Sequence, residues 1–162
     1  MSAEENKAVV RRWYEQIWNS GDLAAVEECF APEVHVHGQS MDWNAVRDAV
    51  SNWLTAFPDF RWHVDHLVAD GDIVAAHVHF TGTHRSVFHG ENLGPFMPTG
   101  RSVSVREMNF FRLAEGKMVD FWFTWDKITF VQQLEGQPPE AAATITFSQQ
   151  LGREPPQATA TT

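Results

Sequence analysis

The segment VSVREMNFFRLAEGKMVDFWFTWD, residues 103–126, decides the fold class. Two runs rich in Val, Phe and Trp, 103–113 and 117–125, flank the pair Glu115-Gly116. Apolar runs of this length on either side of a short glycine-containing turn are typical of a β-hairpin. Residues 103–126 are therefore expected to form two long antiparallel strands.

A second hairpin precedes the first one, and the chain before it is mainly helical. Residues 60–68 and 73–81 read as strands joined through a turn around Gly71. Ser2 followed by Glu5 is a capping box, and the apolar residues after it recur at helical spacing.

Shorter helices are predicted over residues 23–30 and 42–57, with a strand at 33–38 between them. Helices first and strands afterwards indicate an α+β fold, since βαβ units would alternate.

Composition limits the classes of partner. The formal net charge of −9 argues against nucleic acid and anionic membrane surfaces, which both require basic patches. The lone Cys29 excludes an intramolecular disulfide, suits a reducing compartment and is expected to be a buried thiol. No signal segment or membrane span is apparent, so the expected location is the cytoplasm.

The tail repeats part of the sequence before it. TFVQQLEGQPP at 129–139 is echoed by TFSQQLGREPP at 146–156, and the last residues are rich in Pro, Ala and Thr. We expect one domain over residues 1–136 and a partly duplicated, mobile appendage over 137–162.

Five motifs give the chain a resemblance to a known family. They are GTHRSVFHG at 82–90, PTGRSVSVRE at 98–107, EGKMVDFW at 115–122, TWD at 124–126 and FVQQLE at 130–135. Together they resemble the SnoaL-like polyketide cyclases, or ester cyclases, over about residues 7–134. The resemblance implies a ketosteroid-isomerase-like cone, in which a curved antiparallel sheet wraps around N-terminal helices. It also implies that Asp126 is the acid/base of the reaction.

The hairpin register suggests how Asp126 is surrounded. Counting back from the turn places Glu107 opposite Thr124, and puts Glu107, Asn109, Trp122 and Asp126 on one sheet face. A carboxylate beside an indole and near a second carboxylate is expected to have a raised pKa, as a general acid/base requires. In the alternative interpretation, Asp126 caps the following helix and Glu107 points to solvent.

Four further residues are candidates for the site. The resemblance implies that His37 points into the cavity and that the hydroxyl of Tyr14 reaches it. Trp53 and Phe57 lie on the apolar face of the third helix and are expected to form the ligand wall, as Trp122 is. Each has a structural alternative: His37 as an edge histidine, and the aromatic residues as core.

The sequence offers little for a metal or a cofactor. His35-x-His37 and His77-x-His79 each place two imidazoles on one strand face, but no Glu follows at the spacing of cupin-like sites. Neither a dinucleotide fingerprint nor a phosphate-binding loop occurs. We therefore expect neither a metal nor a cofactor.

The resemblance implies a cofactor-independent polyketide-type cyclase of secondary metabolism, such as antibiotic biosynthesis, that closes a ring by an aldol-like acid/base reaction. The substrate would be a small apolar carbonyl compound. The alternatives are an epoxide hydrolase, an isomerase or an ether-ring-forming cyclase on the same fold, or a non-catalytic binder of an apolar molecule. Arg106 and Arg112 fall on the face opposite Asp126, which disfavours epoxide opening.

A homo-oligomer is also expected, most simply a dimer and alternatively a tetramer. Phe121, Phe123 and Trp125 alternate with Trp122 and Asp126, so on this register they lie on the opposite sheet face. Such a face needs an apolar cover, which a second subunit or a helix of the same chain would provide.

Overall fold

The computed structural model describes residues 2–90 and 93–136. The N-terminal helix α1 (Ala3–Arg12) begins with the expected capping box, in which Ser2 Oγ accepts from the Glu5 N–H and the Glu5 carboxylate accepts from the Ser2 N–H. The helix continues into a π-helical turn, η1 (Trp13–Trp18), closed by a hydrogen bond from Asn19 N–H to Tyr14 O at 2.9 Å. Such wider turns often occur at functional sites, and this one carries buried aromatic residues.

A short helical segment and the first two strands follow. The segment consists of η2 (Leu23–Ala25) and α2 (Val26–Cys29), so it ends one residue before the predicted boundary. Cys29 is fully buried, and burial raises the pKa of its thiol to about 11. The hairpin β1 (Phe30–Val36) and β2 (Gln39–Asp42) leads into α3 (Trp43–Ala56), whose N-terminus Asp42 caps by accepting from Ala45 N–H.

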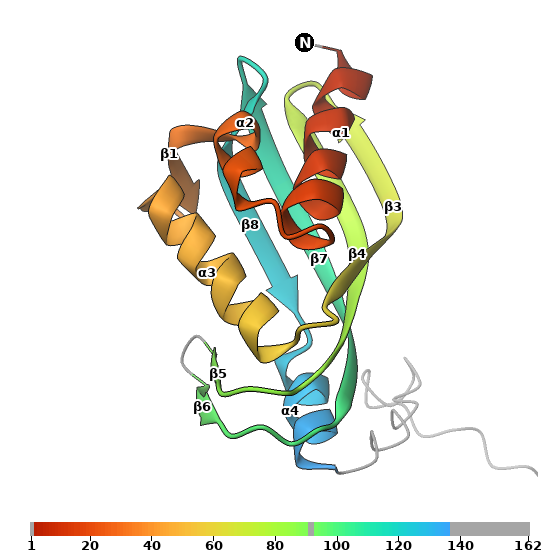
Figure 1. Ribbon diagram of the computed structural model, residues 1–162. Helices are drawn as coiled ribbons and strands as arrows, with labels where there is room; N and C mark the ends of the chain where they lie inside the picture. The colour runs from red at the N-terminus through yellow and green to blue at the C-terminus, as the bar shows by residue number, and fades with distance from the viewer. Residues whose placement is uncertain (1, 91–92, 137–162) are drawn as a thin grey trace, which may run out of the picture.

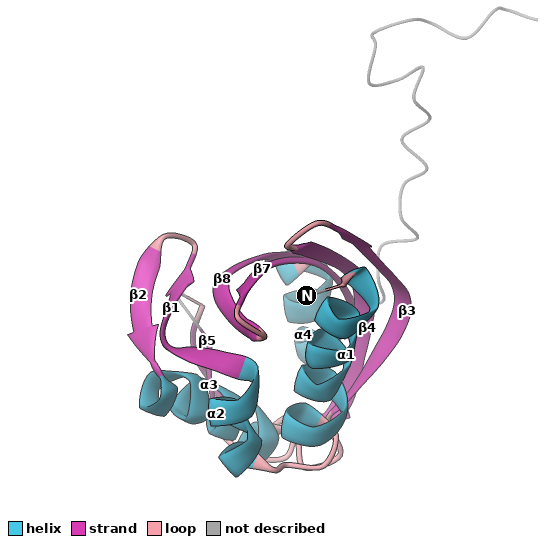
Figure 2. Cartoon of the chain, turned by 90° about the horizontal axis from the view of Figure 1, so that it is seen from above, coloured by secondary structure: helices cyan, strands magenta, loops and turns pink. Residues whose placement is uncertain are grey.

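The sheet is built mainly from the two predicted hairpins. Its long strands are β3 (Arg61–Asp70), β4 (Ile73–Thr83), β7 (Ser102–Ala114) and β8 (Lys117–Trp125). The strand order is β2-β1-β8-β7-β4-β3, antiparallel except that β1 runs parallel to β8. Figure 2 shows this sheet curling around α1, with α2 and α3 on its open side. The α+β cone predicted from the sequence is confirmed.

The register of the β7–β8 ladder changes along its length. Near the turn, Leu113 pairs with Met118, as the sequence predicts, but the next pair is Arg112 with Asp120. Val119 is therefore the extra residue of a β-bulge. Because side chains alternate with a period of two, one extra residue moves the rest of β8 to the opposite face.

The remaining elements close one end of the cone. A small two-stranded sheet, β5 (Phe88–Gly90) and β6 (Gly94–Phe96), lies in the long connection before β7, and α4 (Lys127–Glu135) follows β8 (Figure 1). Helix α4 ends at Gly136 in the left-handed conformation, at φ +76°, which glycine adopts readily. The predicted appendage, 137–162, lies outside the described residues. Within them, all helices are too short or too polar to cross a bilayer.

Candidate active site

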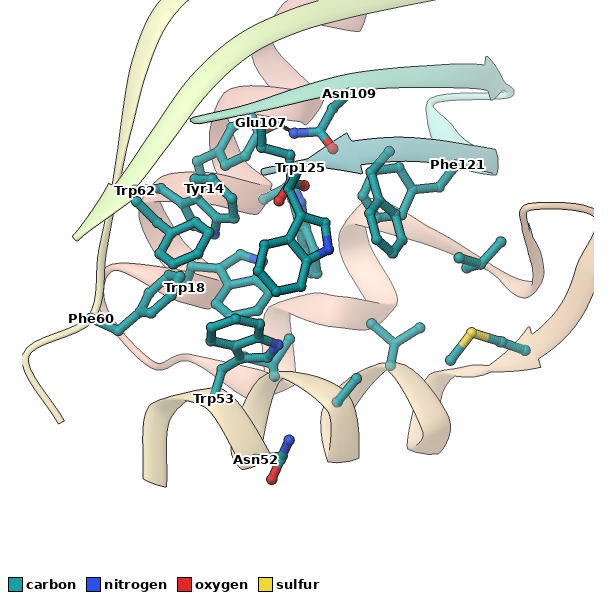
Figure 3. Close-up of a pocket in the computed structure, with 18 of the residues that line it drawn as sticks. Tyr14, Trp18, Asn52, Trp53, Phe60, Trp62, Glu107, Asn109, Phe121 and Trp125 are labelled. Carbon is teal, nitrogen blue, oxygen red and sulfur yellow. Dashed lines mark hydrogen bonds between the residues drawn. The ribbon is translucent and has the colours of Figure 1, made fainter. Parts of the chain in front are cut away.

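A cavity of about 300 Å³ lies between the concave face of the sheet and the helices. Its walls are mainly aromatic and come from η1, α3 and seven strands, and Figure 3 labels ten of the lining residues. Trp53 of α3 is central to this wall, because its ring contacts Phe88 at 4.3 Å and Trp125 at 5.8 Å between centroids. Such a cavity suits a flat, largely apolar ligand.

Three polar residues form a cluster in one wall of the cavity. Tyr14 lies on η1, and Asn109 and Glu107 project from alternate positions of β7. Asn109 is 1% exposed and its Nδ2 donates to the Tyr14 hydroxyl at 3.0 Å. Burial, together with the charge of Glu107, raises the pKa of Tyr14 well above its usual value. Tyr14 therefore keeps its proton at neutral pH.

Glu107 is 9% exposed, and within the described residues it is the one carboxylate that lines the cavity. It pairs across the ladder with Trp125, whose indole lies beside it in Figure 3. A carboxylate at an aromatic wall, next to a phenol and an amide, can exchange a proton with a ligand while its neighbours orient that ligand.

Asp126 does not lie in this cavity. It caps α4, where its carboxylate accepts from Thr129 Oγ1 at 2.6 Å and from Thr129 N–H at 2.9 Å. The hydroxyl of Thr129, followed by its backbone N–H, lowers the pKa of Asp126. The prediction of a cavity-facing Asp126 with a raised pKa is therefore wrong, and the helix-capping alternative describes its contacts.

Trp122 is also placed differently from the prediction. The Val119 bulge puts Trp122 on the outer sheet face, 38% exposed, and turns Phe121, Phe123 and Trp125 to the cavity. The same change sets Glu107 opposite Trp125 and not opposite Thr124.

Two other candidates lie outside the cavity lining. Phe57 is fully buried beneath it, where its ring stacks on His84 with 5.1 Å between centroids. His37 lies in the β1–β2 turn at φ +51°, with its ring 4.6 Å from Phe123. It lines a shallow depression shared with Asp126, next to the cavity. Of the predicted site residues, the cavity thus brings together Glu107, Asn109, Tyr14 and Trp53.

Sequence reasoning missed several lining residues. Trp18 and Trp62 were not singled out, although Trp18 belongs to the apolar face of the first helix and Trp62 is an aromatic residue between Arg61 and His63 at the start of its strand. His89 of β5 lines the cavity as well, beside Phe88. Phe88 itself gave the available signal, because a solvated Gly- and Pro-rich connection does not need a large apolar residue and a ligand-facing loop does.

The histidine pairs form contacts with carboxylates on the outer parts of the sheet. His79 Nδ1 lies 2.9 Å from Asp65 Oδ2 and His77 Nδ1 lies 3.9 Å from it, while His35 approaches Asp120 at 3.5 Å. Among residues 2–90 and 93–136, no three or more His, Cys, Asp or Glu side chains are grouped so that they could hold a metal ion.

Comparisons with known proteins give one family and many related folds. A family model described as SnoaL-like polyketide cyclase matches residues 8–134. The structure resembles TsrD from Streptomyces laurentii with a TM-score of 0.74 and 23% identity, over 85% of this chain and 99% of the other. At that identity the likeness shows the fold alone. No curated protein matches the sequence.

Two further structures are slightly more similar in sequence. IdmH from Streptomyces antibioticus, described as a proposed polyketide cyclase, has a TM-score of 0.67 and 28% identity over 80% of this chain and 98% of its own. AclR from Streptomyces galilaeus, described as a proposed hydroxylase, has a TM-score of 0.68 and 27% identity, over 85% of this chain and 100% of its own. The fold is thus similar to proteins described with two different reactions.

Proposed function

Because this chain belongs to the SnoaL-like polyketide cyclase family, we propose that it closes a ring in a small polyketide-like carbonyl compound, with Glu107 as the acid/base. The observation that carries the proposal is the position of Glu107 in the aromatic cavity, beside Tyr14 and Asn109. Asp126, the acid/base that the motifs suggest, is already engaged as a helix cap.

The reaction would need only proton transfer and orientation. The Glu107 carboxylate removes a proton from a carbon between two carbonyl groups, which leaves an enolate. The enolate carbon bonds to a second carbonyl carbon of the same molecule, and that carbonyl oxygen takes up the proton from Glu107. Protons and electrons balance without an oxidant, and an apolar cavity that holds the two carbons close supplies much of the rate enhancement.

Tyr14 and Asn109 would hold the oxygen atoms of the substrate. Tyr14 stays protonated, so its hydroxyl can donate to an enolate oxygen as negative charge develops there. Asn109 Oδ1 is buried and has no hydrogen-bond partner, so it can accept from an enol hydroxyl. The two residues thus offer a donor and an acceptor on the same side of the cavity.

The other reactions on this fold fit the lining less well. Epoxide opening by paired carboxylates with an arginine would need a guanidinium in the cavity, but Arg106 and Arg112 are on the outer face. Arg112 is paired with Asp120 there. A non-catalytic binder would use the same aromatic walls without Glu107, so the effect of changing Glu107 separates the two functions.

The test measures ring closure directly. Wild type, Glu107→Gln and the control Glu115→Gln, in the exposed β7–β8 turn, are incubated with aryl-substituted 1,3,7-triketones, in which C2 lies between two carbonyl groups and can bond to C7 to close a six-membered ring. This aldol closure, followed by loss of water, gives a conjugated chromophore that absorbance follows. We expect turnover by wild type and by Glu115→Gln only. Turnover of an aryl epoxide panel in place of the ketones, or binding of the ketones with no turnover by wild type, would reject the cyclase function.

We also propose that two copies of the chain pair through the outer face of the sheet. Phe121, Phe123 and Trp125 do not require a second subunit, because they face the cavity, where Trp13 of η1 packs on Phe121 and Trp53 of α3 packs on Trp125. Instead, the ladder aligns Val68, Ala75, Phe110 and Trp122 in one row across four strands, on the outside. In this row Val68 is 63% and Phe110 48% exposed.

The charges around this row favour a second copy as the partner. The exposed Asp70 borders the row at one end of the sheet, and the exposed Arg106 lies beyond it towards the other end. A two-fold axis lying along the row would bring the Arg106 end of one copy over the Asp70 end of the other. Arg106 of each copy would then lie opposite Asp70 of the other.

A further inference from the structure

Two buried indole N–H groups in the cavity wall have no hydrogen-bond partner. They are Nε1 of Trp18, on η1, and Nε1 of Trp62, on β3. Both side chains are at least nine-tenths buried. Figure 3 shows both rings on the same side of the cavity, near Tyr14. Buried donors in proteins are nearly always paired, so two such donors in one wall require an explanation.

The chemistry of these donors specifies what would satisfy them. The indole nitrogen of tryptophan only donates, so each needs an acceptor such as a carbonyl or ether oxygen. Neither nitrogen has a hydrogen-bond partner, and both rings pack on Phe60, with centroids 5.0 Å from Trp18 and 5.6 Å from Trp62. In such an apolar wall a hydrogen bond to an incoming oxygen is stronger than the same bond in water.

The side-chain amide of Asn19 connects the two tryptophans through the backbone of Trp62. Asn19, which follows Trp18, accepts from the Trp62 N–H at 2.7 Å and donates to the Trp62 carbonyl at 3.0 Å. The indole rings meet edge to face at 86°, with centroids 6.0 Å apart. The donors are therefore positioned before any ligand arrives, which reduces the entropy lost on binding.

We propose that Trp18 and Trp62 form an oxygen-binding subsite that selects ligands carrying a hydrogen-bond acceptor on an otherwise apolar ring system. The inference rests on the proposed function of the cavity and adds a specificity determinant to it. Tyr14 connects the subsite to the acid/base cluster, since its ring lies 5.7 Å from Trp62 and its hydroxyl contacts Asn109. One ligand oxygen is bound by the indoles while another meets Glu107, Tyr14 and Asn109.

The test compares two probes of nearly the same shape, 1-tetralone, which carries a ketone, and tetralin, which does not. Calorimetry measures the affinity of each for wild type, Trp18→Phe, Trp62→Phe and the control Trp122→Phe. Phenylalanine keeps an aromatic ring but removes the N–H, and Trp122 lies outside the cavity. We expect wild type and Trp122→Phe to prefer 1-tetralone about tenfold, and Trp18→Phe or Trp62→Phe to lower that preference to about twofold or less.

Other outcomes separate the subsite from the function on which it rests. Equal affinity of wild type for the two probes, or a preference that survives both cavity substitutions, would overturn the subsite and leave the cavity as a ligand site. Failure of wild type to bind either probe would overturn both proposals. A loss of tetralin binding equal to the loss of 1-tetralone binding would show that the tryptophans act through packing alone, and would also reject the subsite.

Discussion

Glu107 and Asp126 carry the same chemical group and are neighbours across the β7–β8 ladder, yet their surroundings are opposite. Glu107 pairs with Trp125, and Asp126 donates its N–H to the carbonyl of Arg106 at 3.3 Å. Glu107 faces the aromatic cavity, whereas Asp126 is exposed and accepts two hydrogen bonds from Thr129. The comparison shows that the sheet face, more than the residue type or its place in a motif, decides what a carboxylate can do.

The largest expected difference between the two carboxylates is in turnover. Glu107→Gln removes the proton acceptor from the cavity and is expected to lower the rate of ring closure by about 10²–10⁴-fold. Asp126→Asn keeps a side chain that caps a helix nearly as well, so the rate is expected to stay within about twofold of wild type. Initial rates on the triketone panel measure both. A rate lost in Asp126→Asn and kept in Glu107→Gln would reverse the assignment.

The inner and outer faces of the same ladder also differ in packing. Phe111 is fully buried, and its ring stacks on Phe121 with 4.6 Å between centroids. Phe111→Ala is expected to lower the free energy of unfolding by about 3–5 kcal/mol, because it leaves a cavity in the core. Urea denaturation followed by circular dichroism measures this value. A loss below about 1 kcal/mol would mean that the inner face is loosely packed.

A substitution on the outer face of the sheet is expected to have a smaller effect, which is on dimer formation. Trp122→Glu places a charge in the exposed row with Val68 and Phe110, and is expected to weaken the proposed dimer by about tenfold or more. Light scattering at several protein concentrations measures the shift towards the 18.4 kDa monomer. Glu115→Gln, which lies away from the row, serves as the control. A wild-type protein that is monomeric at all these concentrations would contradict the dimer.

The smallest expected effect is the loss of stability when the cap of α4 is removed. Asp126→Ala removes both hydrogen bonds from Thr129 and is expected to lower the free energy of unfolding by about 1 kcal/mol at pH 7. The control is Asp48→Ala, at an exposed position of α3, which is not expected to lower the free energy of unfolding in this way.

The contribution of the Asp126 charge depends on pH. Since the pKa of Asp126 is lower in the folded chain, the charge stabilises above the unfolded pKa of about 3.9, and this stability is lost as the pH falls through the folded pKa. The stability difference between wild type and Asp126→Asn should therefore shrink below about pH 3.9, which urea denaturation at pH 7 and pH 3 would show. A difference that grows on acidification would mean that the folded pKa is raised.

Much of the fold and part of the site follow from local sequence patterns. The capping box at Ser2, the two hairpins and the helix of residues 43–56 were predictable, because caps, turns and apolar periodicity act over a few residues. The same alternation correctly put Glu107 and Asn109 on one face of β7. The motifs that resemble the SnoaL-like cyclases correctly implied the cone.

The tertiary structure alone decided which face of β8 meets the cavity. Near the turn the predicted register holds, but the bulge at Val119 moves every later side chain to the other face, which exposes Trp122 and makes Trp125 a wall residue. A bulge is fixed by the pairing of β8 with both of its neighbours, and no local pattern in the chain encodes that pairing. For the same reason the meeting of Trp18 with Trp62, through Asn19, emerged only when the first helix packed on the sheet.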